Sequence, residues 1–553
     1  MSTVSAVVAS AVADHTAEVF ALMGNGNAHF TDALARQGRV RMTGLRHEAA
    51  TVASADAYQR VSRRTAVATT TYGPGYTNAL TPLAEAVCSR TPLVFVVGGE
   101  PTTGRRPWDV DQVALAHAVG ARTLTVDALS PAATTREAFR LAEDERIPVV
   151  LFIPYDVAAA PAADEPATEP APAPVPASSE VQVADPREVE DAARLLAAAR
   201  RPLILAGRGA RDAAAGLGEL ADRIGALTAS SAPARGTFAG REFDLGVCGG
   251  FASEDASKLI RQADVVLAVG VGLNQFTTAF GTQFDAGATL LQIDLTPAPT
   301  NPRVDKHLRA DAAAATDALL GQLADHAAPT QRWEGTAEEA RGSRLNFSRD
   351  TGTGQAPDGL LDPRSAMARL NEILPANRQV VSDGGHFIGW SSYYFDLPAP
   401  DSLTMVGTQY QSIGLGLPSA AGAAIARPGA TTVVVTGDGG GIMGLPDLDS
   451  LVRTAESAVV LVFNDACYGA EIHQYGSQGM DQRIMEIEQA DFAKLAEGFG
   501  ATGLVVDTME DLDAVQGWVN GGARGTLVVD LRISRNVVAP YILEIIELTL
   551  KKK

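Results

Sequence analysis

The sequence has 553 residues, of which 46% are apolar and 20% charged, so it is long enough for three or four globular domains with large cores. Its 45 basic and 65 acidic residues give a formal net charge of −20, which disfavours binding to nucleic acids or anionic membranes. The three cysteines lie far apart without a CxxC motif, which argues against a disulfide framework and a zinc knuckle. The sequence starts without a signal-peptide pattern and has no run of about 18 apolar residues, so we expect a soluble, cytoplasmic protein.

Two changes in composition divide the chain. Residues 158–187 are rich in alanine and proline, and residues 326–362 are also poor in large apolar side chains, which predicts two linkers. We therefore expect an N-terminal domain over 1–157, a middle domain over 188–325, a C-terminal domain over 363–541 and a short tail over 542–553.

Each predicted domain alternates short apolar runs with helical stretches. The runs include AVATTT and LVFVVGG in the first domain, PLILA and DVVLAV in the second, and TTVVVT, AVVLVF and GTLVVDL in the third. Because these runs are short and continuously apolar, they predict parallel strands that are covered on both faces. The fold class expected is therefore α/β, with three doubly wound parallel-sheet domains. Ligands of such sheets lie at the carboxyl ends of the strands, where glycine-rich turns follow these runs.

The N-terminal domain contains three segments with candidate functional groups. The loop GNGNAH ends in His29, which is either a functional group or a loop-to-helix cap. The sequence RHE ends in Glu48 and opens a predicted helix, where a carboxylate is commonly stabilised by the helix dipole. The turn YGPG contains Gly73 and is followed by Asn78.

The middle domain contains AGRGA at 206–210 and AVGVG at 268–272, which resemble Rossmann-type turns. Neither fits the pattern GxGxxG with an acidic residue about 20 positions later, which argues against an NAD-dependent dehydrogenase. We expect no required nucleotide in this domain, with bound FAD or ADP as the alternative.

The C-terminal domain contains the pattern that decides the interpretation. Gly437-Asp438-Gly439-Gly440 ends one predicted strand, and 24 residues lie between Gly439 and the Asn464-Asp465 turn that ends the next. Glycines let backbone amides approach an anion closely, and adjacent parallel strands would bring Asp438 and Asp465 to one edge of the sheet. Two carboxylates beside a diphosphate suit Mg²⁺. The alternative interpretation is two ordinary turns of an α/β sheet.

This spacing resembles the diphosphate and metal signature of thiamine-diphosphate enzymes, and RHE with GPG-x-x-N resembles the pyrimidine-binding domain of their acetolactate-synthase-like and benzaldehyde-lyase-like members. The resemblance implies that Asp438, Asp465 and the carbonyl of Cys467 hold Mg²⁺, although the family usually has asparagine at the position of Asp465. It also implies that Glu48 hydrogen-bonds ring atom N1′ of the cofactor's aminopyrimidine.

Two further segments of the C-terminal domain resemble this family. In QSIGLGLP, Ile413 would separate the two rings of the cofactor, and the carbonyl of Gln411 would accept a hydrogen bond from its 4′-amino group. In DGGHF, the glycines and His386 would cradle the diphosphate, with a capping or surface role for the histidine as the alternative. The cofactor-binding residues implied by the resemblance are Glu48, Gly73, Asn78, Gly384, Gly385, His386, Gln411, Ile413, Gly437, Asp438, Gly439, Gly440, Asp465, Tyr468 and Gly469.

The residues on the substrate side leave the reaction open. Glu471 and His473 follow the metal turn and lie near the thiazolium ring in relatives, unless they are a solvated helix start. Trp108 stands where relatives carry a polar glutamine, and Arg105 and Arg106 either meet a substrate carboxylate or CoA phosphate or are surface charge.

We therefore expect an enzyme that uses thiamine diphosphate and Mg²⁺ to decarboxylate a small 2-oxo acid, with or without carboligation. One alternative is a lyase that cleaves a 2-hydroxy ketone or a 2-hydroxyacyl-CoA, and another is a non-catalytic relative. Because Glu48 of one subunit meets the C-terminal domain of another in this family, the resemblance implies at least a homodimer, and homotetramers are common.

Overall fold

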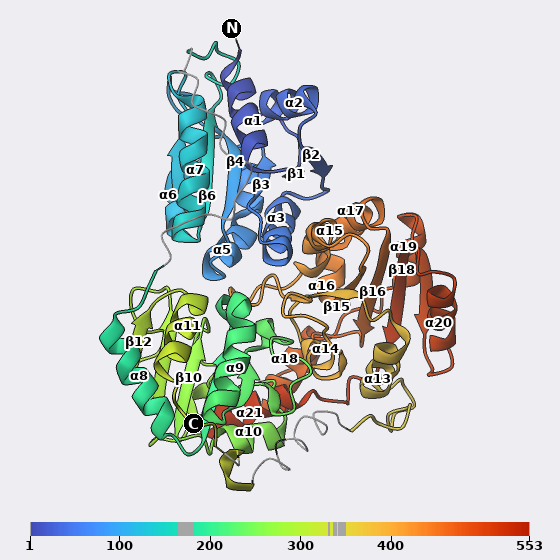
Figure 1. The fold of residues 1–553 in the computed structure, drawn as a ribbon. Helices are drawn as coiled ribbons and strands as arrows, with labels where there is room; N and C mark the ends of the chain where they lie inside the picture. Colours follow the sequence, from blue (N-terminus) through green and yellow to red (C-terminus); the bar gives the residue numbers. More distant parts are fainter. Residues whose placement is uncertain (1, 164–181, 330–331, 336–339, 341–349, 552–553) are drawn as a thin grey trace.

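The computed structural model describes residues 2–163, 182–329, 332–335, 340 and 350–551, and contains three domains (Figure 1). Each domain has a six-stranded sheet in which every pairing is parallel, with helices packed against it. The predicted α/β fold class is confirmed. The predicted linkers lie partly outside the described residues, which lack 164–181 in the first and 330–331, 336–339 and 341–349 in the second.

The N-terminal domain has the strand order β2-β1-β3-β4-β6-β5. Its strands are β1 (Glu18–Ala21), β2 (Arg41–Gly44), β3 (Ala66–Thr70), β4 (Leu93–Gly99), β5 (Arg122–Thr125) and β6 (Pro148–Pro154). Its helices are α1 (Val4–His15), α2 (Ala28–Gln37), α3 (Glu48–Ser62), α4 (Pro74–Asn78), α5 (Leu80–Cys88), α6 (Gln112–Ala118) and α7 (Pro131–Glu145).

The middle domain has the order β12-β11-β10-β7-β8-β9, which is the Rossmann order. Its strands are β7 (Pro202–Ala206), β8 (Leu227–Ser230), β9 (Asp244–Val247), β10 (Val265–Val269), β11 (Thr289–Asp294) and β12 (Lys306–Arg309). Its helices are α8 (Pro186–Ala198), η1 (Arg208–Ala213), α9 (Ala214–Ile224), η2 (Ala232–Ala234), α10 (Glu254–Ile260), η3 (Ala279–Gly281), α11 (Ala312–Gln322) and η4 (Arg332–Gly335). The two glycine-rich turns pack backbone to backbone, since Gly209 N donates to Gly270 O at 3.0 Å. This close approach requires glycine, since a Cβ at Gly270 would lie 2.4 Å from Gly209 C.

The C-terminal domain has the order β14-β13-β15-β16-β18-β17, the same topology as the N-terminal domain. Its strands are β13 (Arg378–Ser382), β14 (Leu403–Thr404), β15 (Thr431–Gly437), β16 (Ser457–Asn464), β17 (Thr502–Val506) and β18 (Gly525–Arg532). Its helices are α13 (Pro363–Ile373), α14 (Ile388–Tyr394), α15 (Gly416–Ala426), α16 (Asp438–Met443), η6 (Leu445–Asp447), α17 (Leu448–Thr454), α18 (Gly469–Gln474), η7 (Gly476–Gln478), η8 (Gln482–Ile484), α19 (Phe492–Gly498), α20 (Leu512–Asn520) and α21 (Pro540–Lys551).

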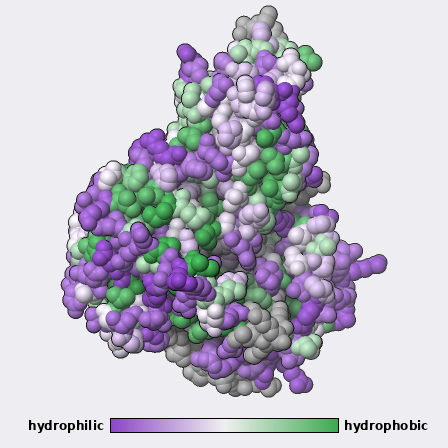
Figure 2. Space-filling model, turned by 180° about the vertical axis from the view of Figure 1, so that it is seen from behind, coloured by the Kyte–Doolittle hydropathy of each residue, from purple (hydrophilic) through white to green (hydrophobic). Residues whose placement is uncertain are grey.

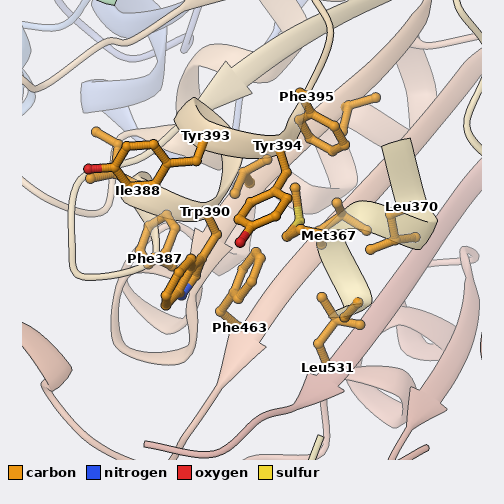
Figure 3. Close-up of a cluster of buried hydrophobic side chains, with 14 of the residues drawn as sticks. Met367, Leu370, Phe387, Ile388, Trp390, Tyr393, Tyr394, Phe395, Phe463 and Leu531 are labelled. Carbon is orange, nitrogen blue, oxygen red and sulfur yellow. The ribbon is translucent and has the colours of Figure 1, made fainter. Parts of the chain in front are cut away.

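An aromatic core fixes the turn that precedes α14. Figure 3 shows the side chains of Trp390 and Tyr394 gathered with Phe463 of β16 and Leu531 of β18. The rings of Phe387 and Phe463 stack with their centroids 5.9 Å apart. Because burial of large apolar side chains is the dominant stabilising term, this core anchors the chain directly above the strand ends.

The N-terminal and C-terminal domains pack through α3 and α15, which lie side by side (Figure 1). Ser54 Oγ of α3 donates to Pro418 O of α15 at 2.7 Å. A Cβ atom at Gly422 would lie 1.9 Å from Ser54 O, so only glycine permits this approach of the two helices. The interface joins segments that are more than 360 residues apart in sequence.

The C-terminal segment, the cysteines and the lengths of the helices also bear on the sequence expectations. The segment expected as a short tail belongs to α21, where Tyr541 and Ile542 are buried, because its apolar residues recur with helical spacing. The three cysteines are free thiols. Among the described residues, no helix is both long enough and apolar enough to span a membrane.

Candidate active site

Two aspartates meet at the carboxyl edge of the third sheet. Strands β15 and β16 pair in parallel, with Gly437 opposite Phe463, so Asp438 and Asp465 follow adjacent strands. Asp438 is 4% exposed, and its Oδ1 accepts a hydrogen bond from Gly439 N at 2.8 Å. Its Oδ2 is buried and has no hydrogen-bond partner among the described residues. A buried carboxylate oxygen without a donor is costly unless a cation or proton meets it.

The electrostatics of this pair fit a cation. Burial and the nearby carboxylate of Asp465 raise the pKa of Asp438 to about 7, and burial raises the pKa of Asp465. The described residues contain no cluster of three or more histidine, cysteine, aspartate or glutamate side chains that could hold a metal alone. Mg²⁺ accepts such a site when a backbone carbonyl, such as that of Cys467, and phosphate oxygens complete its coordination.

Glycines surround these two aspartates and keep side chains away from the backbone of both turns. Gly439 and Gly440 lie in the first turn of α16, and Gly469 begins α18 after Tyr468. A Cβ at Gly440 would lie 2.7 Å from Asp383 Oδ2, so a larger residue would displace that carboxylate. The segment therefore presents backbone and a helix N-terminus at the sheet edge, as an anion such as a diphosphate requires.

Asp383 opens the DGGHF segment and organises this edge, a role that the sequence did not assign to it. It is fully buried at the end of β13, and its oxygens accept hydrogen bonds from Gly384 N at 2.8 Å, Gly414 N at 2.9 Å and Thr436 Oγ1 at 3.2 Å. Burial raises its pKa to about 6, although these donors oppose the shift. The side chain therefore ties the loop of Ile413 to the turn of Gly384. The sequence marks the DGGHF segment, but the contacts of its aspartate with Gly414 and Thr436 arise only on folding.

The loop of Gln411 and Ile413 keeps an apolar side chain exposed beside the same edge. Gln411 has a φ of +59°, and Ile413 is 42% exposed. Ile413 Cγ2 lies 3.3 Å from the position that a Cβ on Gly384 would occupy. An exposed isoleucine on a loop tied down by buried groups is typical of a ligand contact rather than of a core residue.

His386 is buried rather than on the surface. Its Nε2 accepts a hydrogen bond from Ala539 N at 2.9 Å, so the Nδ1 atom carries the proton of the neutral ring. Burial and the neighbouring His473 lower its pKa to about 3. The Nδ1 atom is 3.3 Å from the position of a Cβ on Gly469, so it lies beside the turn that follows β16. The surface alternative for His386 is wrong.

Glu471 and His473, which follow the turn after β16, differ in their surroundings. His473 lies on α18 with its ring centroid 4.8 Å from that of His386, and its Nε2 is buried without a partner among the described residues. Burial lowers its pKa. Glu471, on the same short helix, is exposed. The segment that precedes and begins α21 covers this region, since Tyr541 Oη donates to Gly385 O at 2.8 Å.

Glu48 lies at the carboxyl edge of the first sheet. It begins α3, where His47 caps the helix by accepting from Ala49 N at 3.1 Å. Asn78 Nδ2, at the end of α4, donates to Glu48 Oε2 at 3.0 Å. Gly73 has a φ of +59° and donates its N–H to Gln112 Oε1 at 2.6 Å, which fixes the turn beside them. Glu48 therefore stands at the start of a helix, as the helix-dipole interpretation expects, and it also accepts a specific hydrogen bond from Asn78.

The other N-terminal candidates are held by their own neighbours. Arg105 pairs with Glu100 at 2.8 Å, and Arg106 pairs with Asp109 at 2.8 Å while it stacks on the Tyr72 ring. The surface-charge interpretation fits Arg105, whose side chain is 47% exposed, but not Arg106, whose side chain is 17% exposed and lies over the rings of Tyr72 and Tyr155. Asn27, rather than His29, occupies the cap position of α2, which excludes the capping alternative for His29. Trp108 is 59% exposed and His29 is exposed.

Comparison with known proteins gives one consistent result. Models of the thiamine pyrophosphate enzymes match three parts of the chain: the N-terminal TPP binding domain matches residues 1–118, the central domain 189–319, and the C-terminal TPP binding domain 383–530. A probable acetolactate synthase large subunit of Methanocaldococcus jannaschii is 27% identical over 90% of this chain and 86% of its own length. The sulfoacetaldehyde acetyltransferase of Castellaniella defragrans is 27% identical over 98% and 94%. Acetolactate synthase isozyme 3 of Escherichia coli is 27% identical over 92% and 90%.

Proposed function

The chain belongs to the thiamine pyrophosphate enzyme family, in the group of the acetolactate synthases, and we propose that it uses thiamine diphosphate and Mg²⁺ to decarboxylate a small 2-oxo acid, with or without joining the product to a second carbonyl compound. The observation that carries this proposal is the pair of buried aspartates at the carboxyl edge of the third sheet. Asp438 presents an unpartnered oxygen there, and the neighbouring carboxylate of Asp465 adds a second acidic group beside it.

Each part of the cofactor has a matching group in the chain. Asp438, Asp465 and the Cys467 carbonyl would hold Mg²⁺, and the glycine turns with His386 Nδ1–H would meet the diphosphate. When bound, thiamine diphosphate supplies a nucleophilic thiazolium carbon and an electron sink for cleavage of the bond beside a carbonyl. Ile413 would shape the bend of the cofactor, and the Gln411 carbonyl would accept from its amino group.

Glu48 would act as the acid–base group for ring atom N1′ of the aminopyrimidine. Its carboxylate accepts a hydrogen bond from Asn78 and stands in the first turn of α3. A carboxylate in that position can hold and return a proton at N1′ as the reaction proceeds. Glu471 and His473 are further candidates for proton transfer, and His29 is a candidate for contact with the substrate.

A small acid is favoured over an acyl-CoA because the candidate cations are already paired. Arg105 and Arg106 form ion pairs with carboxylates of their own segment, which leaves them poorly suited to the phosphates of CoA. Relatives of similar length are an acetolactate synthase and a sulfoacetaldehyde acetyltransferase, names that fit a two-carbon or three-carbon acyl donor. We therefore rank pyruvate-like acids first.

We propose at least a homodimer. Glu48 and the aspartate pair lie on the sheet edges of different domains, and apolar side chains around the metal turn are exposed, with Ile413 at 42%, Tyr468 at 41% and Met443 at 61%. Apolar patches are also present on the face shown in Figure 2, among polar side chains. Pairing of an N-terminal domain with the C-terminal domain of a second copy would cover such surface.

The test combines binding with product analysis. Isothermal titration with thiamine diphosphate and Mg²⁺ should give saturable binding, and the cofactor should raise the melting temperature by mass action. Mass spectrometry would then follow pyruvate, longer 2-oxo acids, benzoin-type ketols and 2-hydroxyacyl-CoAs. Release of CO₂ from a 2-oxo acid supports the proposal. Cleavage of a ketol or an acyl-CoA alone would replace it with the lyase function, and absence of binding would favour a non-catalytic relative.

A further inference from the structure

The loop 405–416, which carries the two candidates for contact with the cofactor rings, is anchored by buried side chains of the N-terminal domain. Arg60 Nη1 of α3 donates to Met405 O, at the start of the loop, at 2.9 Å. Glu85 Oε2 of α5 accepts from Tyr410 N, in the middle of the loop, at 2.7 Å. These two contacts cross from one domain to the other and reach backbone atoms of the loop directly.

Glu85 is the centre of a fully buried polar network. Its side chain is 0% exposed, and its Oε1 accepts from Arg60 Nη2 at 2.9 Å and Ser89 Oγ at 2.8 Å. Asp56 binds Arg60 with both oxygens at 2.6 Å. Burial opposes the charge of Arg60, but the carboxylates of Asp56 and Glu85 outweigh it and raise its pKa. Arg208 of the middle domain donates to Ser89 O at 2.6 Å, so all three domains meet at this network.

The network reaches the loop just before Gln411, whereas the residues after Gln411 have other anchors: Ser412 N donates to Gly407 O at 2.9 Å and Gly414 N donates to Asp383 Oδ1 at 2.9 Å. Gln411 follows Tyr410 directly and adopts a φ of +59°, a conformation that an L-residue keeps only where its surroundings enforce it. The side chains of Tyr410 and Ile413 are 51% and 42% exposed, so their burial does not hold the loop. The bond from Tyr410 N to Glu85 therefore fixes the backbone immediately before Gln411.

We propose that Glu85 is a positioning residue, which places the Gln411 carbonyl and the Ile413 side chain for the cofactor. The inference rests on the proposed function for the identity of the ligand, but not for the anchoring of the loop. Glu48 and Glu85 of one N-terminal domain then have different roles. Glu48 faces the cofactor ring, whereas Glu85 shapes the loop of the C-terminal domain in its own chain.

The first test uses hydrogen–deuterium exchange of the full-length protein without cofactor. Glu85→Gln turns one acceptor oxygen into a donor, and Glu85→Asp keeps the charge beside Arg60 but withdraws the carboxylate by one methylene. Both variants should speed amide exchange in 405–412 by about tenfold or more. Glu18→Gln is the matched control, because Glu18 is a buried carboxylate of the same domain that pairs with Arg41 and does not contact the loop.

Unchanged exchange of the loop in a folded Glu85→Asp variant, or an equal change in the control, overturns the proposal. If neither Glu85 variant folds, the wild-type protein decides: the Tyr410 amide should exchange more slowly than its neighbours in 408–411, and equally fast exchange overturns the anchoring.

The second test separates positioning from binding in the loaded protein. The dissociation constant of thiamine diphosphate should change less than about threefold in Glu85→Asp, because the metal and diphosphate groups are untouched. Exchange of the thiazolium C2 hydrogen, followed by NMR after acid quench, should slow by about tenfold or more. A loss of affinity with unchanged C2 exchange contradicts positioning. Failure of the wild-type protein to bind the cofactor would instead refute the proposed function and leave the loop result standing.

Discussion

Asn78 Nδ2 donates to Glu48 Oε2 at 3.0 Å, so an asparagine at the end of α4 fixes the carboxylate that begins α3. Both residues belong to segments that the sequence singles out, RHE and GPG-x-x-N, but sequence alone assigned them separately to the cofactor. The contact shows that the second motif supports the first. The two motifs therefore act together, and their variants should have related effects.

The first prediction concerns this pair. Glu48→Gln should slow C2 hydrogen exchange of bound thiamine diphosphate by about 10²–10⁴-fold, the usual range for loss of a general acid–base group, with nearly unchanged cofactor affinity. Asn78→Ala should slow it less, since the carboxylate remains. NMR of the quenched cofactor measures both rates. Glu137→Gln, at an exposed carboxylate paired with Arg140, is the control, and a fully active Glu48→Gln variant would disprove the assignment.

The second prediction concerns the metal aspartates. Asp438→Asn should weaken binding of the Mg²⁺–cofactor complex by more than about 100-fold, the upper limit for removal of outer-sphere partners. Asp465→Asn restores the residue that the family usually carries and removes one of two crowded charges, so it should retain binding. Isothermal titration of the two variants, which carry the same substitution on neighbouring strands, gives the comparison. Equal losses of cofactor affinity in both variants would show that the predicted difference between Asp438 and Asp465 is wrong.

The third prediction is a pH dependence. Burial and Asp465 raise the pKa of Asp438 to about 7, and only the deprotonated carboxylate binds a cation. Protons therefore compete with Mg²⁺ below that pKa, and cofactor affinity should fall by about tenfold from pH 8 to pH 6. Titrations across this range test it, after correction for the pH dependence of the Mg²⁺–cofactor complex in solution. A flat corrected profile would contradict the prediction.

The fourth prediction concerns the closure by the C-terminal segment. Tyr541→Phe removes the hydrogen bond to Gly385 O, which should cost about 1 kcal/mol locally. The Ala539 amide, which donates to His386, should then exchange about fivefold faster. Hydrogen–deuterium exchange measures this rate, with Tyr475→Phe at a partly exposed tyrosine as the control. No change at Ala539 would mean that the bond does not hold the segment.

The sequence was sufficient for the fold class and for the placement of the aspartates, because both follow from local patterns. Continuous apolar runs predict parallel strands, and adjacent parallel strands bring Asp438 and Asp465 to one edge. The groups that hold the site together could not be found this way. Asp383 opens the DGGHF segment and Glu85 lies in no motif, and both accept hydrogen bonds from backbone amides that become neighbours only after folding. The helix α21 differs from these cases, because its periodic apolar residues are visible in the sequence although a tail is expected there.

The contact between α3 and α15 has a consequence for how the protein is made. The apolar face of α3 leaves the ribosome more than 360 residues before the helix that covers it. At about 5–20 residues per second, that interval lasts roughly 20–70 s. During this time Ala53, Ala57 and Val61 have no partner from the C-terminal domain. We therefore expect ribosome-bound fragments that end before residue 416 to be captured by chaperones more often than the completed chain.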